Sequence, residues 1–422
     1  MNGGSGPSGG SSGSAGAPAP TGGNGGTSAS GGTGGATSGT GGASGSAGTS
    51  GSGGEAGTFG GFGGAAGGGS GGGSGSGVGG AGTGGSTNGG GSGLGGASGS
   101  GGAGKAGSGG SAGKGGAGGG GNSCPLDLVG FATREGGTTG GGNASPTTVT
   151  TQAELRSCAT ASGPRVCRVS GTLTFSPFEE IRVASDKTII GAGNNATIVM
   201  GGFFLAVGIH NVIIRNLTIR DSYVAGQDDS GGDEGGDRDG VQMDTAHHVW
   251  IDHCRFSHLG DGLIDSRMDT TFETVSWNIL ENHNKTFGIG WTENVTAQIT
   301  IHHNILRNTT QRNPSTDNVL RAHLFNNVMQ EITSYGNYAR GGTNMVLQNS
   351  VFINVNNPHY FDTGTLVATS NVYRGTSGTQ ESSGTTFSFF DPGAFYSYTL
   401  DPTSSLEALL QRCAGPRPEL GN

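Results

Sequence analysis

Little of this sequence is charged. Lys and Arg number 21 and Asp and Glu 30 among 422 residues, which gives a formal net charge of −9. Lys and Arg form no cluster anywhere in the chain. A protein that binds nucleic acid needs a basic patch to neutralise the phosphates. We therefore expect no nucleic-acid partner.

Long hydrophobic runs are absent as well. No stretch of about 18 consecutive apolar residues occurs, and a membrane-spanning helix needs about 20. Met1 is followed directly by Gly and Ser residues, without the apolar segment of a secretory signal peptide. The sequence therefore predicts no membrane span, and no signal peptide is visible in it.

Residues 1–123 contain almost nothing but Gly, Ser, Ala and Thr, and their only charged residues are Glu55, Lys105 and Lys114. Such a segment has too little apolar surface to offset the entropy of ordering. Its glycines keep no period of three, which excludes collagen. We predict a disordered linker or tether over 1–123 and one folded domain over 124–422. Because the linker carries one net positive charge, the folded domain carries −10.

Cysteine is scarce, with five in the chain, and the odd number leaves at least one without a partner. Cys158 and Cys167 bracket a short segment and could pair. Cys124 and Cys413 lie at the two ends of the folded domain and could join them. Both disulfides are hypotheses from sequence position alone.

The folded domain contains a repeat. Short apolar or β-favouring segments end in Asn, or once in Cys, at positions 216 (IIRN), 254 (IDHC), 278 (VSWN), 304 (IHHN), 327 (LFNN), 349 (VLQN) and 371 (ATSN). The spacings are 38, 24, 26, 23, 22 and 22 residues, and residues 226–240 would be an insertion in the longest interval. This pattern, without helical periodicity or leucine-rich repeats, predicts an all-β, right-handed, single-stranded parallel β-helix. The aligned Asn side chains would form a buried hydrogen-bonded ladder.

Two residue types invite other interpretations. Cys254 occupies a ladder position, so we interpret it as a buried structural residue and not as a nucleophile. The pairs His247–His248 and His302–His303 invite a zinc site. Neighbouring residues of a strand point to opposite faces, and no H-x-x-x-H or C-x-x-C pattern accompanies them. We therefore expect no zinc site.

The ladder serves as a ruler for charged side chains. Asp261, Lys285 and Arg312 follow successive ladder positions by 7, 7 and 8 residues. They are predicted to stack on one face of successive coils, about 4.8 Å apart. Asp239 and Asp265 precede the next ladder positions by 15 and 13 residues and are predicted to form an adjacent column. Clustered carboxylates repel unless a cation intervenes, and hard oxygen ligands suit Ca²⁺.

Several sequence blocks resemble those of the polysaccharide lyase family 1 pectate lyases, over essentially the whole folded domain. The first are GFATREGGTTGGG, SGTL, SDKTIIGAG and NVIIRNLTI, and the central ones are DGVQMD, VWIDHCRFS, DGLID, NHNKTFGIG and HHNILRNTTQRNP. The resemblance implies a secreted, monomeric, calcium-dependent enzyme. Such an enzyme cleaves α-1,4-linked polygalacturonate (pectate) by β-elimination and leaves 4,5-unsaturated ends.

The resemblance also implies roles for the five charged residues. Asp239, Asp261 and Asp265 match calcium ligands of the family. Lys285 matches the lysine that contacts the substrate carboxylate. Arg312 matches the first arginine of an Arg-x-Pro-x-x-Arg motif and is the proposed catalytic base.

The second arginine of that motif is missing, because Asp317 takes its place. Arg321, just downstream, could supply a replacement guanidinium for substrate binding. Three alternatives stay open. A pectin lyase would act on methyl-esterified substrate but lacks the calcium aspartates. A polygalacturonase would hydrolyse with paired carboxylates, but its Gly-His-Gly and Arg-Ile-Lys motifs are absent here. A non-catalytic polysaccharide-binding β-helix is the third.

Overall fold

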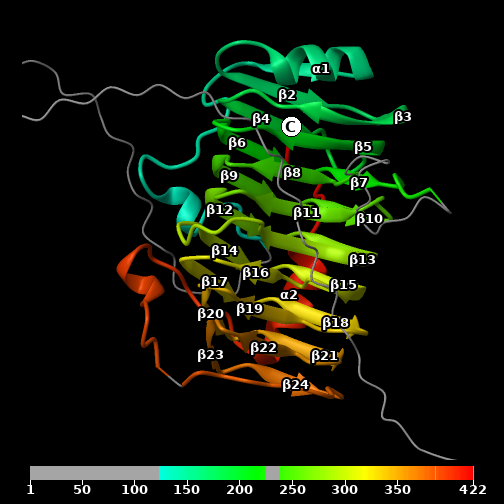
Figure 1. The fold of residues 1–422 in the computed structure, drawn as a ribbon. Helices are drawn as coiled ribbons and strands as arrows, with labels where there is room; N and C mark the ends of the chain where they lie inside the picture. The colour runs from blue at the N-terminus through cyan, green and yellow to red at the C-terminus, as the bar shows by residue number, and fades with distance from the viewer. Residues whose placement is uncertain (1–122, 225–237, 385, 422) are drawn as a thin grey trace, which may run out of the picture. The chain divides into compact units, whose positions relative to one another are not determined.

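The folded domain is the right-handed parallel β-helix that the repeat predicts (Figure 1). The structure is a computed structural model, and it describes residues 123–224, 238–384 and 386–421. Every pairing between its named strands is parallel, and each strand lies on the equivalent strand of the preceding coil. The predicted linker over 1–123, apart from its last residue, and most of the predicted insertion over 226–240 lie outside the described residues.

One wall of the solenoid is a ten-stranded sheet in chain order. It consists of β1 (Pro146–Val149), β2 (Arg165–Val169), β4 (Lys187–Gly191), β6 (His210–Arg215), β9 (His247–Asp252), β12 (Thr271–Ser276), β14 (Gln298–His302), β17 (Arg321–Phe325), β20 (Asn344–Gln348) and β23 (Thr365–Thr369).

The remaining strands form a fourteen-stranded sheet with two arms. Three long strands run through it: β3 (Thr172–Arg182), β5 (Thr197–Leu205) and β13 (Ile279–Gly290). The first arm adds β7 (Thr218–Arg220), β10 (Arg255–Ser257), β15 (Ile305–Gln311), β18 (Val328–Ile332), β21 (Val351–Val355) and β24 (Val372–Arg374). The second adds β8 (Val241–Asp244), β11 (Gly262–Arg267), β16 (Ser315–Asp317), β19 (Asn337–Arg340) and β22 (His359–Asp362).

Helices cover parts of the solenoid. The helix α1 (Gln152–Thr160) begins with a capping box formed by Thr151 and Glu154, and it contacts the first strands, at the top of Figure 1. The helix α2 (Thr403–Cys413) packs against β18 and β21. Two short 3₁₀-helices are η1 (Phe131–Thr133) and η2 (Pro392–Ala394). None of the described helices is long and apolar enough to cross a membrane.

The interior of the solenoid is filled by aliphatic side chains stacked in register. One buried column runs through seven coils of the ten-stranded sheet: Ile189, Ile214, Ile251, Val275, Ile301, Leu324 and Leu347. Burying one such side chain stabilises the fold by about 1.5–3 kcal/mol relative to exposing it. A one-residue slip would turn this column outward, so hydrophobic burial strongly specifies the register.

The predicted ladder is present, although two of its members were wrongly assigned. The side-chain oxygen of Asn278 accepts the backbone N–H of Cys254 at 2.8 Å. Asn304, Asn327 and Asn371 each accept the N–H of the preceding coil at 2.8–3.0 Å. The rung between Asn327 and Asn371 is Ser350, whose hydroxyl accepts the N–H of Asn327 at 3.2 Å.

Asn216 and Asn349 instead belong to the neighbouring column, one residue earlier on each coil. Strand pairing aligns Asn216 with His253 and Asn349 with Asn326. This column turns the corner with positive φ, at 61° for Asn216 and 46° for Asn349. Asn is favoured there because it tolerates the left-handed conformation. The Asn216 amide also donates a hydrogen bond to the carbonyl of Gly191 on the preceding coil at 2.9 Å, but among the described residues its oxygen accepts no N–H of that coil.

Both predicted disulfides are present. Cys124–Cys413 and Cys158–Cys167 have Cα–Cα distances of 5.5 and 5.9 Å. The first joins the beginning of the folded domain to α2 over 289 residues. Cys254 is the free cysteine of the described residues, and it is buried as predicted. Burial raises the pKa of the Cys254 thiol to about 12, which keeps it protonated and unreactive.

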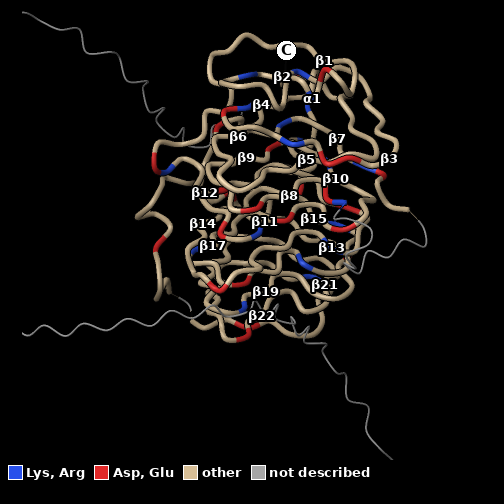
Figure 2. Tube along the Cα trace, turned by 45° about the horizontal axis from the view of Figure 1, so that its top comes forward, with Lys and Arg blue, Asp and Glu red and all other residues tan. Residues whose placement is uncertain are grey.

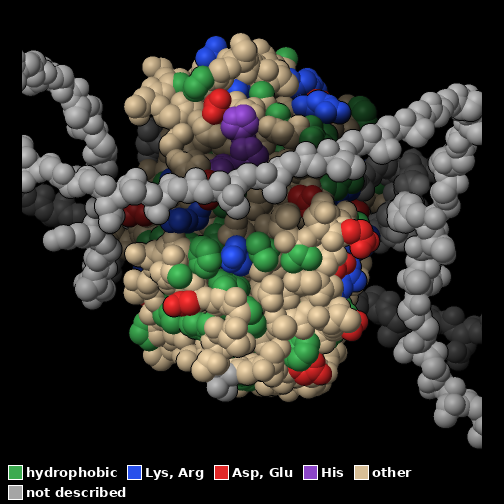
Figure 3. All heavy atoms as spheres, turned by 60° about the vertical axis from the view of Figure 1, so that its left-hand side comes forward, with side chains coloured by type: hydrophobic (Ala, Val, Ile, Leu, Met, Phe, Trp, Pro, Cys, Tyr) green, Lys and Arg blue, Asp and Glu red, His purple; other side chains and the backbone are tan. Residues whose placement is uncertain are grey.

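The histidine pairs correct one step of the sequence analysis. The Nδ1 atoms of His247 and His248 lie 2.7 Å apart, and those of His302 and His303 lie 2.8 Å apart. Neighbouring side chains meet because His248 and His303 have φ near 57°, so they leave the alternating geometry of a strand. Histidines gather on one part of the face shown in Figure 3.

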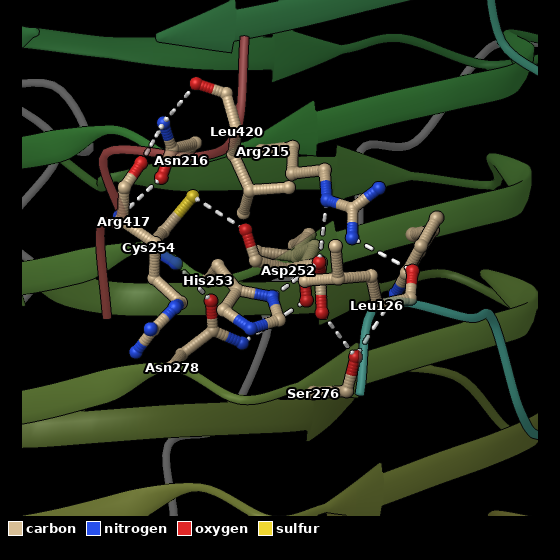
Figure 4. Close-up of polar contacts among 12 residues, drawn as sticks. Leu126, Arg215, Asn216, Asp252, His253, Cys254, Ser276, Asn278, Arg417 and Leu420 are labelled. Atoms are coloured by element: carbon tan, nitrogen blue, oxygen red, sulfur yellow. Dashed lines mark hydrogen bonds and ion pairs between the residues drawn. The ribbon is translucent and has the colours of Figure 1, made fainter. Parts of the chain in front are cut away.

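A buried ion cluster joins the segment at the beginning of the folded domain to the solenoid (Figure 4). Asp252 contacts Arg215 at 2.7 Å, His253 at 2.6 Å and the hydroxyl of Ser276 at 2.7 Å. Arg215 also donates a hydrogen bond to the carbonyl of Leu126. Asp252, His253 and Ser276 are almost completely buried, so this grouping is structural and not a hydrolytic triad.

One carboxyl group lies inside the solenoid. Glu273 is aligned with Val249 and Ile299 in an inward-facing column and is completely buried. One of its oxygens accepts the hydroxyl of Ser266 at 2.6 Å, and the other is buried without a partner among the described residues. Desolvation by burial raises the pKa of Glu273 to about 7. The folded state therefore favours the neutral carboxyl group.

The first prediction follows from this raised pKa. The stability that the neutral form contributes is complete below the ordinary pKa of 4.5 and is lost as the pH rises to about 7. Glu273→Gln cannot ionise, so its melting temperature should exceed that of the wild type more at about pH 8 than at about pH 5. Expressed as free energy of unfolding, the gain of the variant over the wild type between these two pH values is at most roughly 3 kcal/mol. The exposed Glu293→Gln serves as control, and a Glu273→Gln effect that is equal at both pH values would contradict the assignment.

The second prediction tests the ladder. Asn304→Ala leaves the buried N–H of Asn278 and the carbonyl of Val275 without their partners, so it should lower the free energy of unfolding by about 2–4 kcal/mol. Asn349→Ala loses a long 3.4 Å bond and the left-handed preference of Asn, so about 1 kcal/mol is expected. Urea denaturation compares the two variants. Equal losses would show that the two Asn columns are not distinct.

Candidate functional site

The predicted site residues lie on the second arm of the fourteen-stranded sheet and in the turns beside it. Asp239 lies two residues before the start of β8, Asp261 immediately precedes β11, and Asp265 lies within β11. Lys285 lies on β13, and Arg312 follows β15. Both acidic and basic positions occur in the region of β8, β11 and β13 (Figure 2). Strand ends of successive coils thus bring together residues that are up to 73 positions apart in the sequence.

Neither predicted column is in register. In the column of Asp239 and Asp265, Asp265 is aligned with Gln242, three residues after Asp239. The other column is displaced by one residue. Lys285 is aligned with Gly262 and not with Asp261, and on the next coil it is aligned with Gln311 and not with Arg312. The error arises because equal distances from the ladder do not give equal register where turns differ in length. The side chains still meet, because Lys285 Nζ lies 2.6 Å from Asp261 Oδ1.

Two of the three carboxylates converge over a glycine. Asp239 Oδ1 accepts the N–H of Gly262 at 2.5 Å, and Asp265 Oδ1 accepts the N–H of Gly288 at 3.2 Å. A Cβ atom at Gly262 would lie 2.7 Å from Asp265 Oδ1 and 3.1 Å from Asp239 Oδ1. Any side chain at position 262 would therefore fill the space between the two carboxylates.

Burial and mutual repulsion dominate the electrostatics of this cluster. Desolvation, followed by the charges of Asp265, Asp261 and Glu180, raises the pKa of Asp239 well above its usual range. Desolvation also raises the pKa of Asp265 to about 7, although the positive charge of Arg312 opposes the rise. The cluster as it stands holds more negative charge than its surroundings neutralise.

A divalent cation fits these residues. Asp239 Oδ2 is buried and has no hydrogen-bond partner among the described residues, and the glycine at 262 leaves the space between Asp239 and Asp265 open. Carboxylate oxygens are the ligands that Ca²⁺ prefers. Within the described part of the chain, no three His, Cys, Asp or Glu side chains are grouped at metal-binding distances. Asp261 is engaged by Lys285 instead.

Arg312 lies at the edge of the carboxylate cluster. Its backbone adopts the left-handed conformation with φ 58°, and its guanidinium lies 5.5 Å from the ring centre of Trp291. Among the described residues, Arg312 has no ion pair with a carboxylate. It lines a groove of about 190 Å³, together with Trp291, Ser315, Tyr335 and Arg340.

Arg321 is the predicted site residue that the structure does not bring to this groove. It lies at the start of β17 in the ten-stranded sheet. Its guanidinium donates a hydrogen bond to Gln298 at 3.0 Å and lies 4.6 Å from the ring centre of Phe395. The turn after Asp317 carries the chain to another wall of the solenoid, so closeness in sequence does not give closeness in space.

Sequence analysis missed Arg340, the second arginine of the groove. Arg340 is aligned with Asp317 on the adjacent coil, and its Nε lies 3.3 Å from Asp317 Oδ2. The two residues are 23 positions apart, which is the length of one coil between ladder positions 304 and 327. Counting one coil length of 23 residues from Asp317 would therefore have identified Arg340.

Glu180 was also missed. It lies on the long strand β3, more than 50 residues before Asp239, and its negative charge contributes to the raised pKa of Asp239. The repeat begins at Asn216, so the sequence offered no ladder position on the coil that carries Glu180. A fourth carboxylate therefore adds to the negative charge beside the cluster.

Comparison with known proteins agrees with this picture. A sequence profile for pectate lyases matches residues 122–409. A pectate trisaccharide-lyase of Thermotoga maritima is 37% identical over 186 residues, which cover 42% of this chain and 49% of that protein. The chain thus spans about half the length of that relative. A pectate trisaccharide-lyase of Bacillus licheniformis is 29% identical over 314 residues, which cover 68% of this chain and 86% of that protein.

Solved structures share the fold. A pectate lyase from Bacillus sp. N165, solved in complex with trigalacturonate, has a TM-score of 0.58 and 26% identity and covers 69% of this chain and 99% of its own. A Bacillus subtilis pectate lyase variant has the same TM-score at 20% identity and covers 70% of this chain and 98% of its own. With the family profile matched over most of the β-helix, this chain belongs to the pectate lyase family.

Proposed function

We propose that this protein cleaves polygalacturonate by calcium-dependent β-elimination. The observation that carries the proposal is the convergence of Asp239 and Asp265 over Gly262, with one carboxylate oxygen left without a partner among the described residues. Lys285 and Arg312 lie beside this cluster and supply positive charge. The relatives named as pectate trisaccharide-lyases support the substrate class.

Asp239 and Asp265 would hold the calcium ion, and Asp261 would complete the ligand set when its carboxylate turns from Lys285 to the ion. When bound, calcium supplies charge neutralisation and Lewis-acid polarisation of a substrate carboxylate. The open space over Gly262 gives the protein a place for such an ion without a change in the backbone. The two disulfides support a site of action outside the reducing cytoplasm.

The reaction begins with loss of the proton on C5 of a galacturonate residue. That carbon is next to the carboxylate, so removing its proton creates a second negative charge on an anionic group. Lys285 contributes a fixed positive charge where this charge develops. The C4–oxygen bond then breaks, a C4–C5 double bond forms, and no water is consumed.

Arg312 is the proposed base. A guanidinium must first lose a proton to accept another, and a bound carboxylate would oppose that loss. Arg312 has no ion pair with a carboxylate among the described residues and faces the aromatic ring of Trp291, although its charge interacts with nearby Asp265. A cation held by Asp265 would offset the charge of that carboxylate. A nitrogen of the neutral Arg312 side chain then accepts the C5 proton, and the leaving oxygen gains a proton from solvent.

The alternatives differ in what they require of these residues. A pectin lyase acts on uncharged esters and has no use for a carboxylate cluster, so the buried Asp239 and Asp265 argue against it. A non-catalytic binding β-helix would also need a groove but would release no unsaturated product. Ultraviolet absorbance of the unsaturated product, measured with polygalacturonate and with a methyl-esterified pectin, separates these functions.

The third prediction concerns the metal. Activity on polygalacturonate should disappear with chelator and return with added Ca²⁺. Asp265→Asn should weaken Ca²⁺ binding at least about tenfold and reduce activity accordingly, since a buried carboxylate is lost from the cluster. The matched control is Asp269→Asn, because the hydrogen bonds that Asp269 accepts from described residues come from Thr292 and Asn294 in a nearby turn. Full activity in chelator would refute the calcium assignment.

The fourth prediction concerns the base. Arg312→Lys keeps a positive charge but moves the accepting nitrogen, so kcat should fall about 10²- to 10⁴-fold. KM and Ca²⁺ affinity should change by only a few-fold, since proton removal occurs in the transition state. Steady-state kinetics on polygalacturonate provide both constants. Near-normal kcat in Arg312→Lys would remove Arg312 from the mechanism and make Lys285 the next candidate.

A further inference from the structure

The groove beside the carboxylate cluster contains a second arginine that the proposed reaction does not use. Arg312 and Arg340 both line it, together with Trp291 and Tyr335. Arg340 lies on β19. This strand pairs with β16, which follows Arg312 on the same coil, so Arg340 lies one coil beyond Arg312. The groove therefore extends about one coil, or roughly 4.8 Å, beyond the proposed base.

Arg340 is positioned by Asp317, which stands where the family motif has an arginine. Asp317 Oδ2 lies 3.3 Å from Arg340 Nε. A Cβ atom at Gly290 would lie 2.7 Å from Asp317 Cβ, and one at Gly341 would collide with Asp317 Oδ1. Two glycines on neighbouring coils thus make room for this aspartate, and their φ values of 138° and 59° favour glycine.

The terminal nitrogens of Arg340 remain available to a ligand. Its side chain is 49% exposed, and among the described residues its one ion pair is made through Nε. The guanidinium lies 5.8 Å from the ring centre of Tyr338, which supports its flat face. A guanidinium held at Nε presents its other nitrogens in the geometry that binds a carboxylate.

Trp291 provides a flat apolar surface on the same groove. It is 49% exposed, whereas Trp250 and Trp277, the other tryptophans of the chain, are 6% and 3% exposed. A Cβ atom at Gly288 would collide with the ring of Trp291 and would lie 2.9 Å from Asp265 Oδ1. The indole therefore adjoins the carboxylate cluster. An exposed ring at this place suits the apolar face of a sugar.

We propose that Trp291 and Arg340 form a binding subsite for a second uronate residue, next to the one that reacts. Arg340 binds the carboxylate of that residue, and Trp291 packs against its sugar ring. This subsite rests on the proposed function, because the ligand of that function, a polyuronate, carries both a sugar ring for Trp291 and a carboxylate for Arg340. It makes Arg340, and not Arg321, the guanidinium that complements Arg312.

Tryptophan fluorescence offers a direct readout of this subsite. Trigalacturonate is mixed rapidly with the full chain in the presence of Ca²⁺, so that binding is recorded before product accumulates. The emission change should saturate with ligand and should vanish in Trp291→Phe, because the other two tryptophans are buried. Arg340→Gln should weaken binding about tenfold or more through loss of a charge-assisted hydrogen bond.

Two further variants complete the test. Asp317→Asn keeps Arg340 but removes its ionic partner, so a smaller loss of affinity is expected. Arg321→Gln represents the rival assignment from sequence and should bind trigalacturonate as the wild type does. In steady state, Arg340→Gln should raise KM with kcat nearly unchanged, since binding energy is lost equally in ground and transition states.

The outcomes separate the subsite from the reaction. Wild-type affinity in Arg340→Gln, or a loss of affinity in Arg321→Gln instead, overturns the subsite even if unsaturated product is formed. Arg340-dependent binding without any unsaturated product supports the subsite and overturns the proposed reaction. A fluorescence change that persists in Trp291→Phe also refutes the stacking role of Trp291.

Discussion

One hydrogen bond, repeated from coil to coil between positions 254 and 371, fixes the register of the central and later coils of this solenoid. The side-chain oxygen of a ladder residue accepts the backbone N–H of the preceding coil, as Asn278 does for Cys254 and Asn304 does for Asn278. These rungs are buried, so a shift of one residue would leave both the amide and the N–H unsatisfied. The aliphatic column inside the sheet opposes the same shift through loss of burial.

Sequence spacing revealed the coils because the ladder imposes a nearly constant interval. It could not tell the ladder from the adjacent left-handed column, since both favour Asn for different physical reasons. Asn349 has a positive φ, whereas Ser350 makes the rung. The predicted columns of charge were displaced for a related reason. Turns of different length separate the ladder from Lys285 and Arg312, and only strand pairing fixes their alignment.

The site shows how much of its electrostatics depends on small residues. Asp239 and Asp265 can approach each other because Gly262 lies between them, and Trp291 can lie beside them because position 288 is glycine. Buried carboxylates this close destabilise the fold unless a cation or proton joins them. The glycines thus create a place that is costly when empty of positive charge and favourable when a cation is bound. Under the proposed function, a cation bound at this place would let a domain of formal charge −10 attract an anionic polysaccharide to one face.

The exchange of an arginine for Asp317 illustrates how a solenoid can rearrange a site. In a fold built of stacked coils, a position one coil away is a spatial neighbour, although it is 23 residues away in the sequence. A guanidinium can therefore move from one coil to the next while remaining on the same groove. Asp317 then gains a different task, because its carboxylate orients Arg340. A motif read along the chain records this change as the loss of a substrate-binding residue. In our proposal, the coil geometry places the positive charge one coil further along the groove, toward the place where the next sugar of a bound chain would lie.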